Sequence, residues 1–142
     1  MSNQLLREVA RLHYQLQKLK VNECQRTSLA ECHILTELEQ NGEMTVAELS
    51  RKLALDKAWI SRTIDALDQD GVVTKKKSIE DARLVKIKLS QKGKARSKEL
   101  NQKLNEISDR VLDRLSKEKK AATLDMLKLL KEALEKELSE EY

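Results

Sequence analysis

Residues 45–71 read TVAELSRKLALDKAWISRTIDALDQDG, a stretch that holds two amphipathic segments separated by a short break. The first segment opens with Thr45, and Glu48 follows three residues later. A hydroxyl and a carboxylate at this spacing form a capping box, in which the two side chains satisfy backbone N–H groups at the start of a helix. The pattern therefore predicts a short helix over residues 46–53.

The second segment follows Asp56, whose carboxylate can cap the N-terminus of a helix. Three aliphatic residues then recur at helical spacing and predict one inward stripe: Ile60, Ile64 and Leu67. Gly71 can end this helix, because glycine adopts the left-handed backbone that often follows a helix. We therefore expect a second helix over residues 57–69, separated from the first by a tight turn.

After Gly71 the sequence alternates between apolar and polar residues, which predicts strands over residues 72–75 and 84–89 joined by a polar connection. Residues 72–98 carry ten basic and two acidic residues, a net charge of +8, whereas the whole chain carries only +4. A helix fits the major groove of DNA and a basic hairpin reaches its phosphates, so this order is typical of a winged helix-turn-helix.

Longer amphipathic helices flank this core. Leucine and valine recur at steps of four and three near the N-terminus, and two helices rich in leucine follow Ser90. The apolar faces of these helices need a surface to pack against, and a second copy of the chain can supply it, so we expect a homodimer. The predicted fold is mostly α, a winged helix-turn-helix with a two-stranded β wing and long terminal helices. We expect one domain over residues 1–142, with a DNA-binding core at 28–90 and dimerisation helices at 1–20 and 95–140.

Composition narrows the class of protein. Charged residues make up 37% of the chain, Pro and Phe are absent, and there are three glycines, which favours packed helices with an aliphatic core. No apolar run approaches the roughly 20 residues that cross a bilayer, and the N-terminus lacks the apolar block of a signal peptide. We expect a cytoplasmic protein without a membrane partner. Without a Gly-rich phosphate loop, a nucleophile elbow or a dense metal motif, we expect neither an enzyme nor a cofactor.

The outward side of the second core helix supplies the candidate DNA contacts, with Arg62 as the best base reader. The candidates on this helix are Lys57, Ala58, Trp59, Ser61, Arg62 and Asp65. Trp59 has two interpretations, contact with thymine methyl groups or packing against a neighbouring element. In the wing, Lys75, Lys76 and Lys77 either contact phosphates or form a solvated strand, and strand alternation allows about two of the three to face DNA.

The motif LSRKLALDKAWISRTIDALDQDGVV, followed by Glu80-Asp81-Ala82-Arg83 and by LSQKG, resembles the multiple antibiotic resistance regulator (MarR) family over residues 1–140. The resemblance implies a homodimer joined through its terminal helices, with Arg83 at the wing tip entering a minor groove and Asp81 orienting the backbone or the arginine. It also implies repression that a ligand, metal or oxidant relieves. Two departures leave base preference open: Ala82 replaces an arginine common in that wing motif, and Trp59 occupies a position that is usually small or polar.

A possible effector site lies near the junction of the first two helices, at Cys24, Cys32 and His33. Cysteine and histidine can bind zinc, although the spacing matches no dense zinc motif. A thiolate beside basic residues can also act as a redox switch. The third interpretation, which we favour, makes Cys32 a small core residue, Cys24 incidental and His33 a satisfied polar residue. No metal site is predicted.

These observations predict a dimeric, sequence-specific transcription regulator that binds double-stranded DNA, and a repressor released by a small ligand, oxidant or metal. The alternative is a winged-helix protein–protein interaction module without specific DNA binding, because winged helices also occur in complexes that never touch bases.

Overall fold

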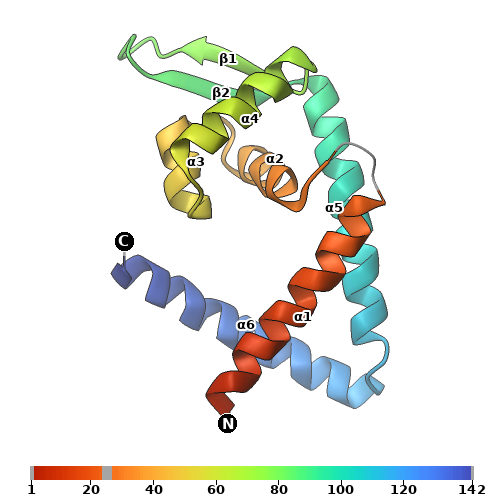
Figure 1. The fold of residues 1–142 in the computed structure, drawn as a ribbon. Coiled ribbons are helices and arrows are strands. Elements are labelled where there is room, and N and C mark those ends of the chain that lie inside the picture. Colours follow the sequence, from red (N-terminus) through yellow and green to blue (C-terminus); the bar gives the residue numbers. More distant parts are fainter. Residues whose placement is uncertain (1, 24–26, 142) are drawn as a thin grey trace. The chain divides into compact units, whose positions relative to one another are not determined.

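The computed structural model of the chain describes residues 2–23 and 27–141 and is mostly helical, with one two-stranded antiparallel sheet (Figure 1). The elements in chain order are α1 (Ser2–Asn22), α2 (Leu29–Asn41), α3 (Val46–Leu53), α4 (Lys57–Gln69), β1 (Val73–Lys77), β2 (Val85–Leu89), α5 (Gln91–Leu112) and α6 (Lys117–Glu141). This architecture confirms the predicted winged helix-turn-helix with long terminal helices. None of the helices in the described part is long and apolar enough to cross a membrane.

The chain divides into two compact units, residues 1–105 and residues 106–142. The first unit holds α1 to α4, the hairpin and most of α5, and the second holds the end of α5 together with α6. The expectation of a single domain over residues 1–142 stays a prediction.

The core of the first unit is aliphatic and lies between α2, α3, α4, the hairpin and the first half of α5. The largest side chains that are at most 1% exposed come from four of these elements: Ile34, Leu35, Leu38, Leu49, Ile60, Ile64 and Ile87. Burying one such side chain contributes about 1.5–3 kcal/mol, so the inward stripe of α4 holds this helix firmly in place. The stripe predicted from sequence, including Leu67, is confirmed.

Side-chain caps set the helix starts, as the sequence predicts. Thr45 Oγ1 accepts from the Glu48 N–H at 3.1 Å and Asp56 Oδ2 accepts from the Trp59 N–H at 3.0 Å. The same arrangement opens α2 at Ser28, which accepts from the Glu31 N–H at 3.1 Å. Each such cap stabilises its helix by about 1 kcal/mol.

The hairpin differs from its prediction at the strand ends. The Val72 N–H donates to the Leu67 carbonyl at 2.8 Å and so completes the end of α4, and β1 begins one residue later. β1 then runs to Lys77, which pairs with Val85. A third segment joins the sheet edge through one antiparallel bridge between Met44 and Ile87, with N···O distances of 3.0 and 2.8 Å.

Two helices carry apolar side chains that remain exposed. In α1, Leu5, Val9, Leu12 and Leu19 are 52–65% exposed, and they belong to the seam predicted from sequence. In α6, all of which is described, no side chain is buried. Several large apolar residues of α6 are 40–59% exposed: Leu124, Met126, Leu127, Leu129, Leu134 and Leu138.

Candidate nucleic-acid interface

The turn between α3 and α4 sets the direction of α4. Ala54 adopts the left-handed conformation with φ 53°, and it is the only non-glycine residue with positive φ in the described part of the chain. The Leu55 N–H donates to the Ser50 carbonyl at 3.1 Å, and Ser50 Oγ donates back to the Leu55 carbonyl. These two hydrogen bonds lock a tight turn, so α4 leaves α3 at a defined angle and its outer side faces solvent.

Five of the six candidate residues on α4 lie at the surface. Its inward stripe fills the core, and the side opposite that stripe presents Lys57, Ala58, Ser61, Arg62 and Asp65 to solvent. Ser61 and Arg62 are adjacent in sequence, and Asp65 neighbours both on the helix surface, because residues three and four apart are neighbours on a helix. α4 therefore offers an exposed polar row of Ser61, Arg62 and Asp65 with Arg62 as its basic side chain, and Lys57 is a second exposed basic residue at the start of the helix.

Trp59 is only partly exposed and packs against the hydrophobic core. Its carbonyl accepts a hydrogen bond from Thr63 Oγ1 at 2.8 Å, within the helix. Of the two interpretations drawn from sequence, this geometry favours packing, since the part of the ring held against the core cannot reach a ligand.

The three lysines of β1 do not behave alike. The Lys75 ammonium lies 2.5 Å from Asp65 Oδ1 and 3.9 Å from Asp68 Oδ2, so it is directed toward α4. The hydrogen bond to Asp65 raises the pKa of Lys75 above its ordinary value. Lys76 and Lys77 are exposed, and within residues 2–23 and 27–141 neither has a carboxylate at ion-pair distance.

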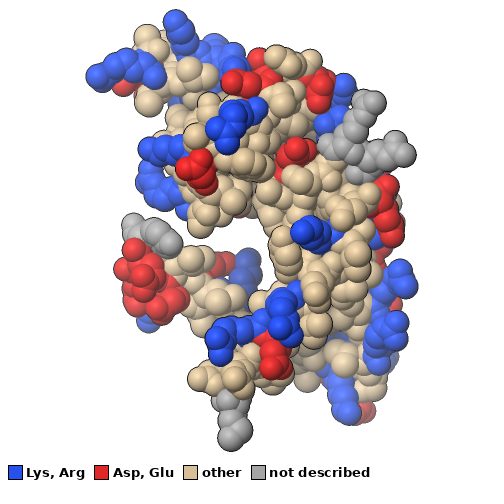
Figure 2. All heavy atoms as spheres, in the orientation of Figure 1, with Lys and Arg blue, Asp and Glu red and all other residues tan. Residues whose placement is uncertain are grey.

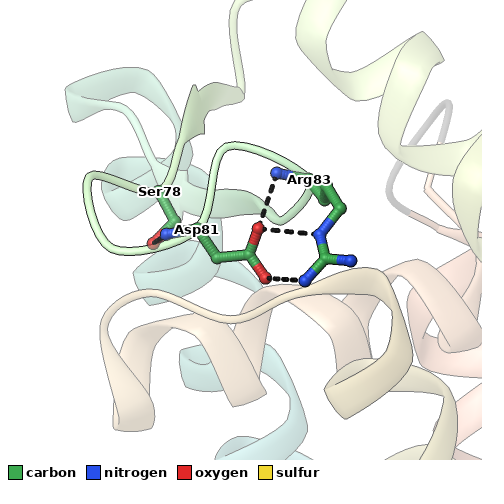
Figure 3. Close-up of polar contacts among 3 residues, drawn as sticks. All are labelled: Ser78, Asp81 and Arg83. Carbon is green, nitrogen blue, oxygen red and sulfur yellow. Dashed lines mark hydrogen bonds and ion pairs between the residues drawn. The ribbon is translucent and has the colours of Figure 1, made fainter.

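The wing tip is held together by a second contact between a basic side chain and a carboxylate (Figure 3). Asp81 Oδ1 accepts from both the backbone N–H and Nε of Arg83, at 3.0 and 3.1 Å, and Asp81 Oδ2 accepts from Nη2 at 3.2 Å. These bonds lower the pKa of Asp81, the side-chain bond from Arg83 being the largest cause. The Asp81 N–H itself donates to Ser78 Oγ at 3.4 Å. The Arg83 side chain is nevertheless 90% exposed, so its guanidinium is oriented and still accessible.

Sequence reasoning missed other basic residues of this surface. Arg51 and Lys52, in the last turn of α3, are exposed, and their charge was the only available signal. Lys86 lies directly opposite Lys76 in the hairpin, and opposed residues share one face of a sheet. In Figure 2 the Lys and Arg atoms gather at the outer end of the hairpin and over α3. The positive surface therefore extends beyond the residues singled out from sequence.

Of the candidate effector residues, Cys32 and His33 lie in the described part of the chain and differ in exposure. Cys32 is 1% exposed within the core, and His33 lies on the exposed side of α2. Partial desolvation lowers the pKa of His33, and Glu37 opposes this shift. Cys24 lies outside the described residues. In the part of the chain that the structure describes, no group of three or more His, Cys, Asp or Glu side chains could hold a metal ion.

The chain is similar to known winged-helix transcription regulators in sequence and in fold. Residues 27–85 match the model of the MarR family. The chain is 25% identical over 126 residues to the uncharacterised HTH-type transcriptional regulator YdgJ of Bacillus subtilis, covering 84% of this chain and 77% of that protein. A crystal structure of a mutant MarR from E. coli matches with a TM-score of 0.81 at 23% identity, over 93% of this chain and 95% of that one.

A third known protein shares the fold of this chain. Bordetella bronchiseptica BpsR, a protein whose DNA binding is regulated by 6-hydroxynicotinic acid, matches with a TM-score of 0.71 at 18% identity. The match covers 92% of this chain and 93% of that one. At this identity the likeness concerns the fold.

Proposed function

We propose that the chain is a member of the MarR family of winged-helix DNA-binding regulators, which are not enzymes, and that it is a dimeric, sequence-specific repressor of transcription released by a small ligand. The observation that carries the proposal is the exposed polar row of α4, where Arg62 stands one helical turn before Asp65. This helix is rigidly seated on the core, so it can present a fixed set of donors to the base edges of a major groove.

The wing supports the same function. Arg83 projects from the hairpin tip with its guanidinium oriented by Asp81, and an oriented arginine loses less side-chain entropy when it enters a minor groove. Lys76 and Lys77 are exposed on the adjacent strand and supply positive charge for phosphates. Sequence-specific binding needs both contacts to base edges, which α4 can make, and contacts to the DNA phosphates, which the wing can make.

Dimerisation is supported by the exposed apolar faces of α1 and α6. Isolated surface leucines are common, but the exposed apolar residues of α1 recur at helical spacing and form a stripe. A second copy of the chain can cover such a stripe by an isologous contact. Sedimentation equilibrium at micromolar concentration should give a dimer, and a monomer under these conditions would contradict this part of the proposal.

Release by a small ligand is supported by the regulation of BpsR, a protein of the same fold. The burial of Cys32 in the core gives an oxidant or a soft metal no direct access to its thiol. The regulation of BpsR and the burial of Cys32 together support a small ligand as the effector.

Fluorescence anisotropy of the purified protein on duplexes tiled from the region upstream of its own gene tests the proposal, with a scrambled duplex of equal composition as the control. One tile should bind selectively, and its affinity should fall by a factor of about 10³ or more between roughly 50 and 200 mM salt if six or more phosphates are contacted. Equal binding to every tile and to the scrambled duplex would favour the protein–protein interaction module.

A further inference from the structure

Two carboxylates stand on the part of α4 that follows its candidate base reader. Asp65 is three residues after Arg62, and Asp68 follows Asp65 by three, so all three share neighbouring positions on the helix surface. The side chains of Asp65 and Asp68 are 58% and 42% exposed. Carboxylates on a helix that approaches DNA repel the phosphates, so their charge must be compensated if α4 is to enter a groove.

Lys75 supplies that compensation from the wing. Its ammonium contacts Asp65 at 2.5 Å and lies 3.9 Å from Asp68, while only 35% of its side chain is exposed. The strand that carries it is anchored on both sides, because Val73 is 1% exposed and Ile87, the cross-strand partner of Lys75, is fully buried. The ammonium is therefore held at α4 by a strand that the core fixes in place.

We infer that Lys75 is a positioning residue for DNA binding, which neutralises Asp65 and Asp68 and ties the wing to α4, rather than a phosphate contact. The inference rests on the proposed function and deepens it. The sequence allowed about two of Lys75, Lys76 and Lys77 to face DNA, and the inference assigns the phosphate contacts to Lys76 and Lys77.

The neighbouring residue provides the contrast that makes the inference testable. Lys76 has the same charge and lies on the same strand, but alternation directs it to the opposite face of the hairpin. Within the described residues it has no carboxylate at ion-pair distance. Lys76→Ala therefore removes one positive charge from the wing and leaves the ion pairs of Asp65 and Asp68 with Lys75 intact. It is the matched control for Lys75→Ala.

The experiment is a double-mutant cycle on the selective duplex, measured by anisotropy at one salt concentration. Lys75→Ala should weaken binding about tenfold in the wild-type background, the size of effect expected when a charge pair near an interface is broken. In the double variant Asp65→Asn/Asp68→Asn, the same substitution should weaken binding less than about threefold, because neither position then carries a negative charge that Lys75 would neutralise. Lys76→Ala should weaken binding by the same factor in both backgrounds.

An equal loss for Lys75→Ala in the two backgrounds would overturn the inference and make Lys75 a direct phosphate contact. Titration of each variant with duplex well above its Kd gives the active fraction, so a folding defect is separated from a change in affinity. All the substituted side chains are at least one-third exposed, so we expect the variants to fold.

A second readout does not involve DNA. In ¹⁵N NMR spectra of lysine ammonium groups, the Lys75 resonance of the protein alone should move when Asp65 and Asp68 become asparagine, and the Lys76 resonance should not. An unmoved Lys75 resonance would overturn the pairing itself. If the wild-type protein selects no duplex, the proposed function fails and the role of Lys75 in DNA binding fails with it, while the spectrum still reports on the ion pairs.

Discussion

Gly93 packs against the backbone where α5 begins, and Gly93→Ala should destabilise the protein. A Cβ at this position would lie 2.0 Å from the Val72 carbonyl oxygen and 3.2 Å from Cδ2 of Leu89. An ordinary C···O contact is about 3.3 Å or longer, so the start of α5 would have to move by more than about 1 Å. The Val72 carbonyl cannot easily yield, because it accepts from both the Ser90 N–H and Ser90 Oγ at 3.0 Å.

The magnitude follows from three contributions. Overpacking of a dense site costs about 1–3 kcal/mol. Lengthening the two hydrogen bonds from Ser90 costs about 0.5–1.5 kcal/mol each. Alanine is better than glycine inside a helix by about 1 kcal/mol, which offsets part of the loss. The net expectation is a decrease of about 3 kcal/mol in the free energy of unfolding.

Urea denaturation followed by circular dichroism measures this loss, at a fixed protein concentration because the stability of the proposed dimer would depend on concentration. Gly42→Ala is the control for backbone strain alone: Gly42 has φ +78° and ψ −99°, a conformation that other residues rarely adopt, but a methyl group there would meet no atom within 4 Å, so only a strain penalty of about 1–3 kcal/mol applies. A decrease below about 1 kcal/mol for Gly93→Ala would refute the close-approach argument.

Three further predictions concern α4 and the wing. Arg62→Ala should cost about 1–3 kcal/mol of binding to the selective duplex and relax base preference; equal weakening on random DNA, measured by anisotropy, would contradict base reading. Arg83→Ala should raise the pKa of Asp81 toward its ordinary value of 3.8, as measured by carboxyl ¹³C NMR. Because the pKa of Asp81 is depressed in the folded protein, the contact with Arg83 stabilises the wing tip above pH 3.8, and this stabilisation is lost as pH falls through the depressed pKa. An unchanged pKa of Asp81 in Arg83→Ala would exclude Arg83 as the cause of the depression. Asp56→Ala should lower the free energy of unfolding by about 1 kcal/mol through loss of the α4 cap, whereas Asp56→Asn should stay near wild type in urea denaturation.

Local signals in the sequence were sufficient for the helix pair. The caps at Thr45 and Asp56 act within three residues, so they mark the starts of α3 and α4 without any tertiary information. The stripe of α4 follows from helical periodicity, which also indicates which residues must face outward. The predicted bounds of α3 and α4 agree with the structure for this reason.

The partners of individual side chains depended on packing between elements that are distant in sequence. Lys75 and Asp65 are ten residues apart and meet because α4 packs against β1, which no local pattern encodes. The register that places Lys86 opposite Lys76 is set by the wing connection. The partial burial of Trp59 likewise depends on the core beneath α4.

The sequence by itself therefore determined the elements, their order and the concentration of positive charge after Gly71, because capping, periodicity and composition act over a few residues. Only the tertiary structure decided which of the charged side chains remain available to a ligand. Lys75 is engaged by α4 and Arg83 is oriented by Asp81, since an ion pair forms where the folded backbone brings two groups together.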